Sequence, residues 1–353
     1  MPTMRQVAEH AGVSIATVSF VVNNTKPVTA ATRARIEASM AELGYRPNAV
    51  ARALASRRTR ILALAYPAQD HRLGGSGMEF MNAAAQAAGE HGYHLMIWPG
   101  ANDGPELTEL VGQQLVDGVI LMEVQLDDPR VPALQASGTP YALIGRTADP
   151  SGSLHVDIDF EQTTRDAIEH LYGLGHRRIV FATGSQTPKS YYNYGPYVRS
   201  ERAFRTEAER RGLQPVVVEC GHDAVAGRAL AERLLSDHPD TTAVLLLNEF
   251  AAIGLLTELT HQGVAVPGDV SIVSMLTSRE LANYTQPSLT IMNSPGVGLG
   301  RLAVEHLVKE MLTGERPAPV MLPSTLVVGE STAPPPAPTT AARATARSPR
   351  RLG

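Results

Sequence analysis

Residues 7–24 read VAEHAGVSIATVSFVVNN, and this stretch decides the fold expected at the N-terminus. Apolar residues recur at helical spacing on both sides of Gly12, and a glycine suits a tight turn because it adopts left-handed backbone angles without steric cost. Ala8 provides a small side chain where two helices cross, while Val13 and Val18 provide apolar contact between them. The stretch therefore predicts a helix-turn-helix.

The second helix of this motif contains no Arg, Lys or Gln, the side chains that most often read bases. It is compatible with a DNA-reading helix and equally with a buried helix of a three-helix core. The neighbouring sequence predicts three short helices over residues 3–45. Their expected N-terminal capping groups are Thr3 with Gln6, then Ser14, then Thr29 or Thr32.

Charge is distributed unevenly along the chain. Residues 1–60 carry nine Lys or Arg and three acids, whereas residues 332–353 carry four Arg and no acid. Because the whole chain has a net charge of −4, the long middle segment is strongly acidic. A basic module joined to an acidic one indicates that only the first approaches a polyanion, although a solvated charged surface would have the same composition.

From residue 61 onward, apolar runs such as ILALAY, YHLMIW, GVILM and PYALI alternate with amphipathic stretches. Such alternation predicts α/β architecture: two lobes, each a doubly wound parallel sheet with helices on both faces, and a ligand cleft at the carboxyl ends of the strands. Strands are expected near 179–182, 215–219, 243–247 and 270–273. Helices are expected near 76–91, 105–115, 129–136, 161–173, 200–211, 224–236 and 250–262.

The continuous stretch from residue 4 to 59, including ATVS, VTAATR and LGYRPNAVARAL, strongly resembles the headpiece and hinge of the lactose-repressor (LacI/GalR) family. Weaker similarity follows in LVDGVIL, GHRRI, VPGDVSIVS and PSLTIMN. The resemblance implies a helix-turn-helix domain over 1–46, a hinge helix over 47–60 and a two-lobed effector-binding and dimerisation domain over 61–330 that is similar to periplasmic binding proteins. Residues 331–353, rich in Pro, Ala and Arg, are expected to form a disordered basic tail.

The family resemblance implies roles for the residues of the second helix. Ile15, Ala16 and Phe20 correspond to the positions whose side chains face the major groove. Phe20 stands where the family commonly has Arg, so we expect apolar contacts with thymine methyl groups there, or alternatively a packing role for the ring. Short polar side chains suited to phosphate contacts are Ser14, Thr17, Ser19 and Asn23.

The hinge segment is the second element that the resemblance connects with DNA. A Leu at the position of Leu54 inserts into the central base step of a near-palindromic operator, and Arg52 is placed to neutralise a flanking phosphate. This implies binding to double-stranded operator DNA as a homodimer. No C-terminal heptad repeat is present, which favours a dimer over a tetramer.

Candidate effector contacts follow from the rule that ligands bind beyond the carboxyl ends of parallel strands. Asp70 and His71 follow the first strand, Arg146 follows PYALI, and Asn248 follows LLL. All four are also compatible with ordinary loop or capping roles. Tyr192 belongs to the aromatic run at 191–197, which suits stacking on a sugar or packing on its own lobe.

Two departures from the family pattern affect the effector. Leu276 stands where the family often has a sugar-binding Asp, and Ser200 stands where it has an effector-binding Arg, with Arg199 and Arg202 nearby. We therefore expect Arg199 or Arg202 to substitute in effector binding. The effector is expected to be a sugar or a related metabolite.

Other functional classes find little support. The chain lacks the HExxH, GxSxG and P-loop motifs, and its single cysteine excludes a cysteine-based zinc cluster, so no enzyme activity, metal or cofactor is expected. No signal peptide or membrane-spanning run is recognised, which favours a cytoplasmic protein without membrane contact. The expected function is that of a transcriptional repressor, and the alternative is a small-molecule-binding protein that has lost or altered DNA recognition.

Overall fold

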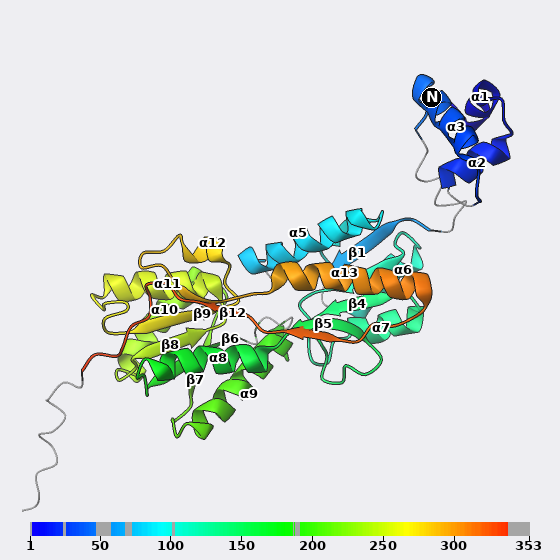
Figure 1. Cartoon of the computed structure of the whole chain (residues 1–353). Helices are drawn as coiled ribbons and strands as arrows, with labels where there is room; N and C mark the ends of the chain where they lie inside the picture. The colour runs from blue at the N-terminus through cyan, green and yellow to red at the C-terminus, as the bar shows by residue number, and fades with distance from the viewer. Residues whose placement is uncertain are drawn as a thin grey trace, which may run out of the picture.

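A computed structural model of the chain describes residues 2–23, 26–46, 58–67, 73–100, 103–185, 187 and 191–337. A small helical headpiece, residues 2–46, lies beyond one end of an elongated body that consists of two α/β lobes (Figure 1). We call the lobe nearer the headpiece the N-lobe and the other the C-lobe. The two-lobed α/β architecture expected from the alternating sequence is confirmed.

The headpiece consists of α1 (Met4–Ala11), α2 (Ile15–Asn23) and α3 (Ala30–Glu42). The expected capping groups are present: Thr3 and Gln6 form a capping box, Ser14 Oγ accepts the Thr17 amide, and Thr29 Oγ1 accepts the Thr32 amide. The turn between α1 and α2 passes through Gly12 at φ 61°. A small core holds the three helices together, and its buried members are Val7, Ala8, Ala11, Val18, Val21 and Ile36.

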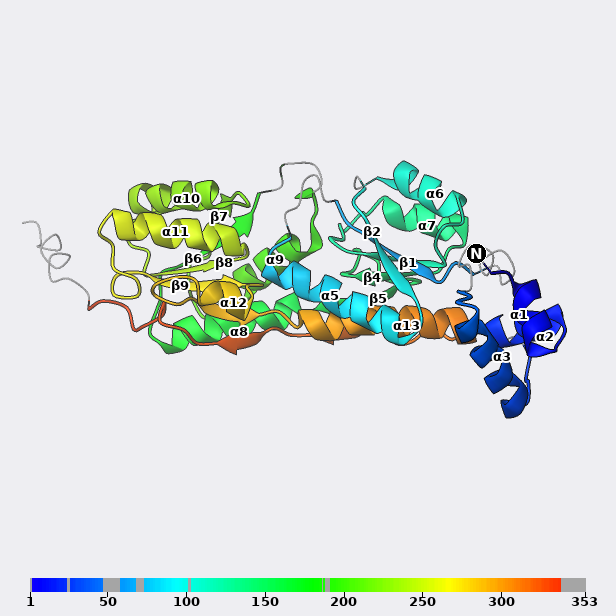
Figure 2. The same cartoon turned by 90° about the horizontal axis from the view of Figure 1, so that it is seen from above.

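The N-lobe contains a six-stranded parallel sheet in the order β11-β5-β4-β3-β1-β2. Its strands are β1 (Ile61–Ala65), β2 (His94–Trp98), β3 (Gly118–Leu121), β4 (Tyr141–Ile144), β5 (Leu154–Ile158) and β11 (Val320–Leu322). Its helices are α5 (Gly75–Glu90), α6 (Gly104–Gly112), α7 (Arg130–Ser137) and α13 (Gly296–Thr313). Helices α5 and α13 cover one face of the sheet and α6 and α7 cover the other (Figure 2).

The C-lobe repeats this design with the strand order β12-β10-β9-β8-β6-β7, in which only β12 is antiparallel to its neighbour. Its strands are β6 (Ile179–Gly184), β7 (Val216–Cys220), β8 (Ala243–Leu246), β9 (Ser271–Met275), β10 (Thr290–Asn293) and β12 (Thr325–Val327). Its helices are α8 (Phe160–Gly173), α9 (Gly195–Arg210), α10 (Ala224–Asp237), α11 (Glu249–His261) and α12 (Arg279–Ala282). Buried apolar runs such as Ala243–Leu246 explain why the strands sit between two helical layers.

The chain crosses between the lobes three times, from β5 to α8, from β10 to α13 and from β11 to β12. These crossings bring the carboxyl ends of β4 and β5 in the N-lobe close to the amino-terminal ends of α9 and α11 in the C-lobe (Figure 1). The space that the sequence rule assigns to a ligand therefore lies between the two lobes.

Two boundaries differ from the sequence expectations. Helix α9 begins at Gly195 rather than near residue 200, because Pro196 suits the first helical turn, where its missing amide proton is not needed. The C-lobe extends past residue 330: Ser331 Oγ donates to Ile272 O, and Ala333 exchanges hydrogen bonds with Ser271. Within the described ranges, no helix is both long and apolar enough to cross a membrane.

Candidate functional site

The exposed surface of α2 is the candidate DNA interface of the headpiece. Val18 and Val21 face the core, whereas Ile15 is about half exposed and Ala16 is exposed on the outer side. Ser14 Oγ and Thr17 Oγ1 lie 2.8 Å apart at the start of the helix, and Ser19 is half-buried. One face of the helix is therefore buried against the core, and the opposite face presents short side chains that DNA could reach.

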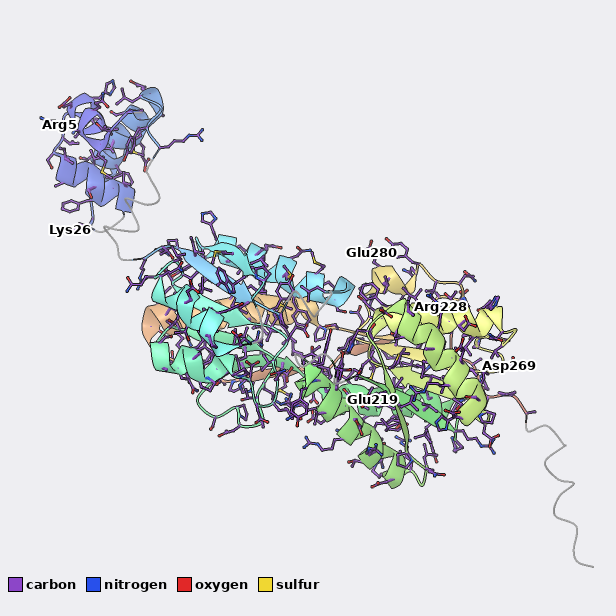
Figure 3. All side chains as sticks on the ribbon, turned by 180° about the vertical axis from the view of Figure 1, so that it is seen from behind. Arg5, Lys26, Glu219, Arg228, Asp269 and Glu280 are labelled. Carbon is purple, nitrogen blue, oxygen red and sulfur yellow. The ribbon has the colours of Figure 1, made fainter. Side chains whose placement is uncertain are left out.

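Phe20 is half-buried and lies outside the headpiece core, as expected if it does not serve as a core aromatic. The ring is in cation–π range of Lys26, whose ammonium Nζ lies 5.0 Å from the ring centroid. Lys26, labelled in Figure 3, is exposed and comes from the segment after α2. The fold thus supplies a cation beside a recognition helix whose own sequence has none.

Three residues of the candidate DNA surface fall outside what the structure describes. Arg52 and Leu54 belong to the hinge segment, which lies beyond the described residues. Asn23 is the last residue of α2, and its side chain is likewise outside the described part. Their roles stay predictions from the sequence.

The second candidate site is a cavity of about 150 Å³ between the two lobes. Both lobes contribute polar groups to its wall: Ser76, Glu123 and Asp157 from the N-lobe, and Asn248 and Glu249 from the C-lobe. Its aromatic lining residues are Phe80, Phe160, Tyr191, Tyr194, Tyr197 and Phe250. Carboxylates that accept hydrogen bonds, combined with aromatic faces, suit a ligand with a ring and several hydroxyl groups.

The tyrosine run forms one packed unit beside the cavity. Tyr191 stacks on His222 with ring centroids 3.8 Å apart, and the Tyr197 hydroxyl lies 2.9 Å from His222 Nδ1. Tyr194 meets Tyr197 edge to face at 4.8 Å. Burial raises the pKa of Tyr194 and Tyr197 well above the ordinary value, so both hydroxyls keep their protons at neutral pH.

The effector candidates from the sequence divide into four groups. Asn248 lines the cavity, and its Oδ1 caps α11 by accepting the amides of Phe250 and Ala251 at 3.0 Å, so its capping role is present while its effector contact stays a prediction. Tyr192 is 60% exposed and is not among the cavity-lining residues, unlike its three neighbours in the run. Asp70 and His71 lie outside the described residues.

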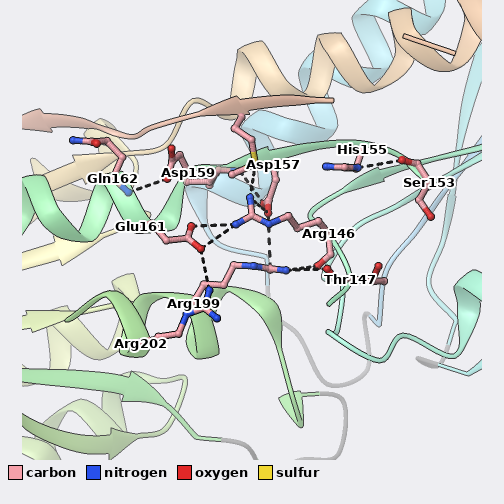
Figure 4. Close-up of polar contacts among 12 residues, drawn as sticks. Arg146, Thr147, Ser153, His155, Asp157, Asp159, Glu161, Gln162, Arg199 and Arg202 are labelled. Carbon is pink, nitrogen blue, oxygen red and sulfur yellow. Dashed lines mark hydrogen bonds and ion pairs between the residues drawn. The ribbon is translucent and has the colours of Figure 1, made fainter. Parts of the chain in front are cut away.

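Arg146 and Arg199 do not line the cavity and lie behind Asp157 instead. Arg146 contacts the carboxylates of Asp157, at 3.6 Å, and Glu161, at 3.1 Å (Figure 4). Arg199 comes from the C-lobe and donates to the carbonyl oxygens of Arg146 and Thr147 in the N-lobe. Arg199 therefore joins the lobes beside the cavity, which differs from the direct effector contact expected from the sequence.

Other contacts also close the cavity. On one side, the Gly75 amide donates to Glu249 Oε1 at 2.6 Å and Ser76 Oγ donates to the Leu276 carbonyl at 2.6 Å. On the other side, the Leu126 amide donates to the Asn193 carbonyl at 2.8 Å. The two lobes therefore contact each other on both sides of the space they enclose.

The sequence reasoning missed Glu123 and Asp157 as lining residues. Glu123 follows the strand run GVILM, and Asp157 lies in LHVDI, a strand buried along its whole length. An acidic side chain near the carboxyl end of a buried parallel strand is the signal that would have found both. Among the described residues, no group of three His, Cys, Asp or Glu side chains is placed to hold a metal ion.

Comparisons with known proteins find relatives for both parts of the chain. Residues 3–48 match the model described as "Bacterial regulatory proteins, lacI family", and residues 168–332 match "Periplasmic binding protein-like domain". The chain is 32% identical over 342 residues to the HTH-type transcriptional regulator CelR of Thermobifida fusca, covering 94% of this chain and 98% of that protein. It is 30% identical over 313 residues to catabolite control protein A of Priestia megaterium, covering 88% and 92%.

Solved structures give the same result. A structure of the lac repressor dimer bound to operator and the anti-inducer ONPF is similar with a TM-score of 0.79 and 27% identity, covering 94% of this chain and 99% of that one. A CelR–cellobiose complex is similar with a TM-score of 0.69 and 29% identity, covering 94% and 100%. By their names, CelR is a transcriptional regulator and the lac repressor is bound to its operator.

Proposed function

Because the chain belongs to the lacI family of DNA-binding bacterial transcriptional regulators, we propose that it is a repressor whose operator affinity is set by a sugar bound between its lobes. It acts as a homodimer on a near-palindromic operator. We further propose that it is cytoplasmic, because a bacterial operator lies in the cytoplasm. The solved relatives bound to operator and to cellobiose support the two halves of this proposal.

The observation that carries the effector proposal is the composition of the interlobe cavity. Glu123, Asp157 and Glu249 contribute carboxylates to the lining, and Tyr191, Tyr194 and Tyr197 contribute aromatic faces. Among the described lining residues there is no Lys or Arg, so a phosphorylated or carboxylated ligand would find no direct cationic partner on this wall. These features favour an uncharged sugar.

On DNA, the headpiece presents α2 to the major groove. Ile15, Ala16 and Phe20 provide apolar contact, and Ser14 and Thr17 provide short polar groups for phosphates. Lys26 adds a cation at the end of the same surface. The hinge segment 47–60, with Leu54 as a wedge in the minor groove, supplies the remaining specificity through DNA deformation.

Coupling between the two sites follows from lobe closure. A sugar that contacts both cavity walls binds the closed arrangement more tightly than an open one, and it can shift the equilibrium only by that difference in affinity. The N-lobe adjoins the hinge segment, so closure changes the spacing of the two hinge segments in a dimer. Couplings of this kind change the affinity of the second ligand by about 5- to 150-fold.

A thermal-shift screen tests the effector proposal. We expect at least one sugar among glucose, galactose, cellobiose, maltose and lactose to raise the unfolding temperature, and the same sugar to change operator affinity in a fluorescence-anisotropy titration. A sugar that stabilises the protein without changing operator affinity would favour the alternative, a binding protein that has lost or altered DNA recognition. If glucose 6-phosphate stabilises the protein and no neutral sugar does, the uncharged-sugar proposal is wrong.

A further inference from the structure

Asp117 holds the backbone that joins the hinge segment to the N-lobe. Its Oδ1 accepts hydrogen bonds from the Thr59 amide at 2.7 Å and from Thr59 Oγ1 at 2.9 Å, and its Oδ2 accepts the Arg60 amide at 3.0 Å. Asp117 itself is half-buried and directly precedes β3. Both oxygens of one carboxylate therefore bind the last two residues of the expected hinge segment 47–60, where β1 begins at the end of the N-lobe nearer the headpiece (Figure 1).

Arg60 adopts a left-handed backbone conformation with φ 59°, which is uncommon for a residue other than glycine. Contacts at three groups hold it there. Its amide donates to Asp117, its carbonyl oxygen accepts the His94 amide at 2.8 Å, and its guanidinium carbon lies 5.1 Å from the centroid of the Tyr93 ring. Such a conformation persists only where its surroundings enforce it, and such positions cluster at functional sites. The N-lobe therefore imposes the direction in which the chain passes from the hinge segment into β1.

Asp117 lies at one end of β3, and the interlobe cavity lies at the other end. The strand is buried along its whole length and pairs with β1 on one side and β4 on the other. Glu123, which follows its carboxyl end, lines the cavity, and three residues later Leu126 makes the hydrogen bond to Asn193 of the C-lobe. Close-packed interiors transmit strain, so we expect a displacement of the cavity end of β3 to move Asp117 as well.

We propose that Asp117 is a positioning residue for operator binding: its carboxylate fixes how the hinge segment leaves the N-lobe and passes movements of the cavity wall to that segment. The inference rests on the proposed coupling between the cavity and the operator, and it names the point where this coupling leaves the N-lobe. With Thr59 and Arg60 anchored, the end of the hinge segment is ordered before DNA binds. Without the anchor, its ordering entropy is lost on binding, which weakens the operator complex.

The expected effect of removing Asp117 has the opposite sign to the effect of its charge. The hinge segment contains Arg57 and Arg58, which are suited to DNA phosphates. Removing a carboxylate beside this segment reduces repulsion of the phosphates, and by itself it would tighten binding to any duplex. Weaker operator binding by Asp117→Ala would therefore arise from the lost contacts with Thr59 and Arg60 rather than from the change in charge.

Asp103 offers a matched control in the same lobe. It is the N-cap of α6, and its Oδ1 accepts the Glu106 amide at 3.2 Å. Asp103→Ala removes the same charge and a hydrogen bond of the same kind, from a carboxylate to a backbone amide, while the hinge contact stays intact. A general structural role for Asp117 predicts similar effects of the two substitutions on operator binding, whereas a positioning role predicts different ones.

Hydrogen–deuterium exchange of the full-length protein tests the contact without DNA or ligand. Loss of hydrogen bonds to a charged acceptor predicts that the Thr59 and Arg60 amides exchange about tenfold or more faster in Asp117→Ala, while exchange in α5 and α13 is unchanged. Asp103→Ala should leave exchange at these two amides unchanged. Unaltered exchange at Thr59 and Arg60 in Asp117→Ala, or faster exchange throughout the N-lobe, overturns the inference. If Asp117→Ala does not fold, Asp117→Asn, which keeps the shape and one acceptor oxygen, is measured with the same expected direction.

Fluorescence anisotropy then tests the consequence for DNA, with an operator selected from a library of randomised duplexes and a random duplex of equal length. We expect Asp117→Ala to weaken operator binding by about fivefold or more and to bind the random duplex as tightly as the wild type or more tightly. Asp103→Ala should bind both duplexes like the wild type. A sugar of the thermal-shift panel that stabilises the wild type should change operator affinity by a smaller factor in Asp117→Ala.

The failure of this inference can be distinguished from the failure of the proposed function. If the wild type discriminates between the two duplexes and Asp117→Ala retains the full operator affinity or the full sugar effect, the inference is wrong and the proposed function stands. Equal losses in Asp117→Ala and Asp103→Ala have the same meaning. If the wild type itself binds the operator and the random duplex equally, the proposed function fails and the inference fails with it.

Discussion

Glu249 Oε1, in the C-lobe, accepts a 2.6 Å hydrogen bond from the backbone amide of Gly75, in the N-lobe. Gly75 is the first residue of α5, and the preceding N-cap, Gly74, has no side chain to cap the helix. A carboxylate from the opposite lobe therefore takes the place of a local cap, where the helix dipole favours negative charge. The closed arrangement of the lobes and the stability of α5 depend on the same contact.

Substitution of Gly74 tests this contact. A Cβ added at Gly74 would overlap Glu249 Oε1, although its backbone angles of φ −78° and ψ −170° are open to any residue. We expect Gly74→Ala to displace the carboxylate and to lower the free energy of unfolding by roughly 1.5–3 kcal/mol, the range for a hydrogen bond to a charged group. Small-angle X-ray scattering should show a larger radius of gyration because the lobes separate.

The control for this substitution lies in the same helix. A Cβ added at Gly89 in α5 meets no atom within 4 Å. Gly89→Ala is therefore expected to stabilise the protein by about 0.5–1 kcal/mol through helix propensity alone and to leave the scattering profile unchanged. If Gly74→Ala and Gly89→Ala lowered the free energy of unfolding equally, the effect at Gly74 would not act through Glu249.

Removal of the Lys26 charge should change the salt dependence of operator binding. Lys26 is exposed beside Phe20 at the end of the recognition surface, so we expect its ammonium to contact DNA phosphate. With two copies in a dimer, Lys26→Met should reduce the slope of log K against log salt by about 1.8. The measurement is fluorescence anisotropy at several salt concentrations. Lys309→Met on α13, which removes a Lys that pairs with Glu315 in the N-lobe, serves as the control and should leave the slope unchanged.

Phe20→Arg tests whether this position reads bases. An arginine there can make bidentate hydrogen bonds to guanine, whereas a phenyl ring cannot. Such a pair contributes about 1–3 kcal/mol to discrimination against the other bases. Selection from a library of duplexes with two randomised, inverted half-sites should therefore yield a guanine in the half-sites of the variant that is absent from those of the wild type. If both proteins select the same sequences, Phe20 has a packing role and the apolar reading surface proposed for α2 is wrong.

The raised pKa of Asp157 predicts a pH dependence of stability. Because the pKa is about 7 in the folded protein and 3.8 in the unfolded chain, the folded state binds the proton more tightly. The contribution of Asp157 to stability is therefore greatest below about pH 4 and is lost progressively as the pH rises to about 7. Urea unfolding at several pH values should show the wild type losing more stability over this range than Asp157→Asn. Parallel curves for the two proteins would contradict this pKa.

Much of the headpiece could be predicted from sequence because local interactions determine it. The capping residues Thr3, Ser14 and Thr29 act within a single helical turn, and Gly12 adopts the left-handed conformation that the turn requires. The cation over Phe20 could not be predicted, because the contact depends on how the chain folds back after α2. Spacing along a helix indicates which residues share a face, but not which distant residue covers them.

The cavity shows the same limit. The rule that ligands bind beyond the carboxyl ends of parallel strands placed Arg146 and Asn248 near the cavity. It did not reveal that Arg146 lies behind Asp157. Nor could the sequence show that Arg199 binds backbone carbonyl groups of the other lobe, since that contact depends on how the two lobes meet. Side-chain direction and contacts between lobes are tertiary properties that periodicity does not encode.

We expect this chain to recognise a specific near-palindromic DNA sequence and to change its affinity for that sequence in response to a sugar. The most direct measurement is a fluorescence-anisotropy titration of the selected operator and of a random duplex of equal length at 150 mM salt, with and without the sugar found by thermal shift. We predict that the protein binds the operator about 10³-fold or more tighter than the random duplex, and that the sugar changes operator affinity by at least about fivefold. Equal affinity for the operator and the random duplex would contradict it.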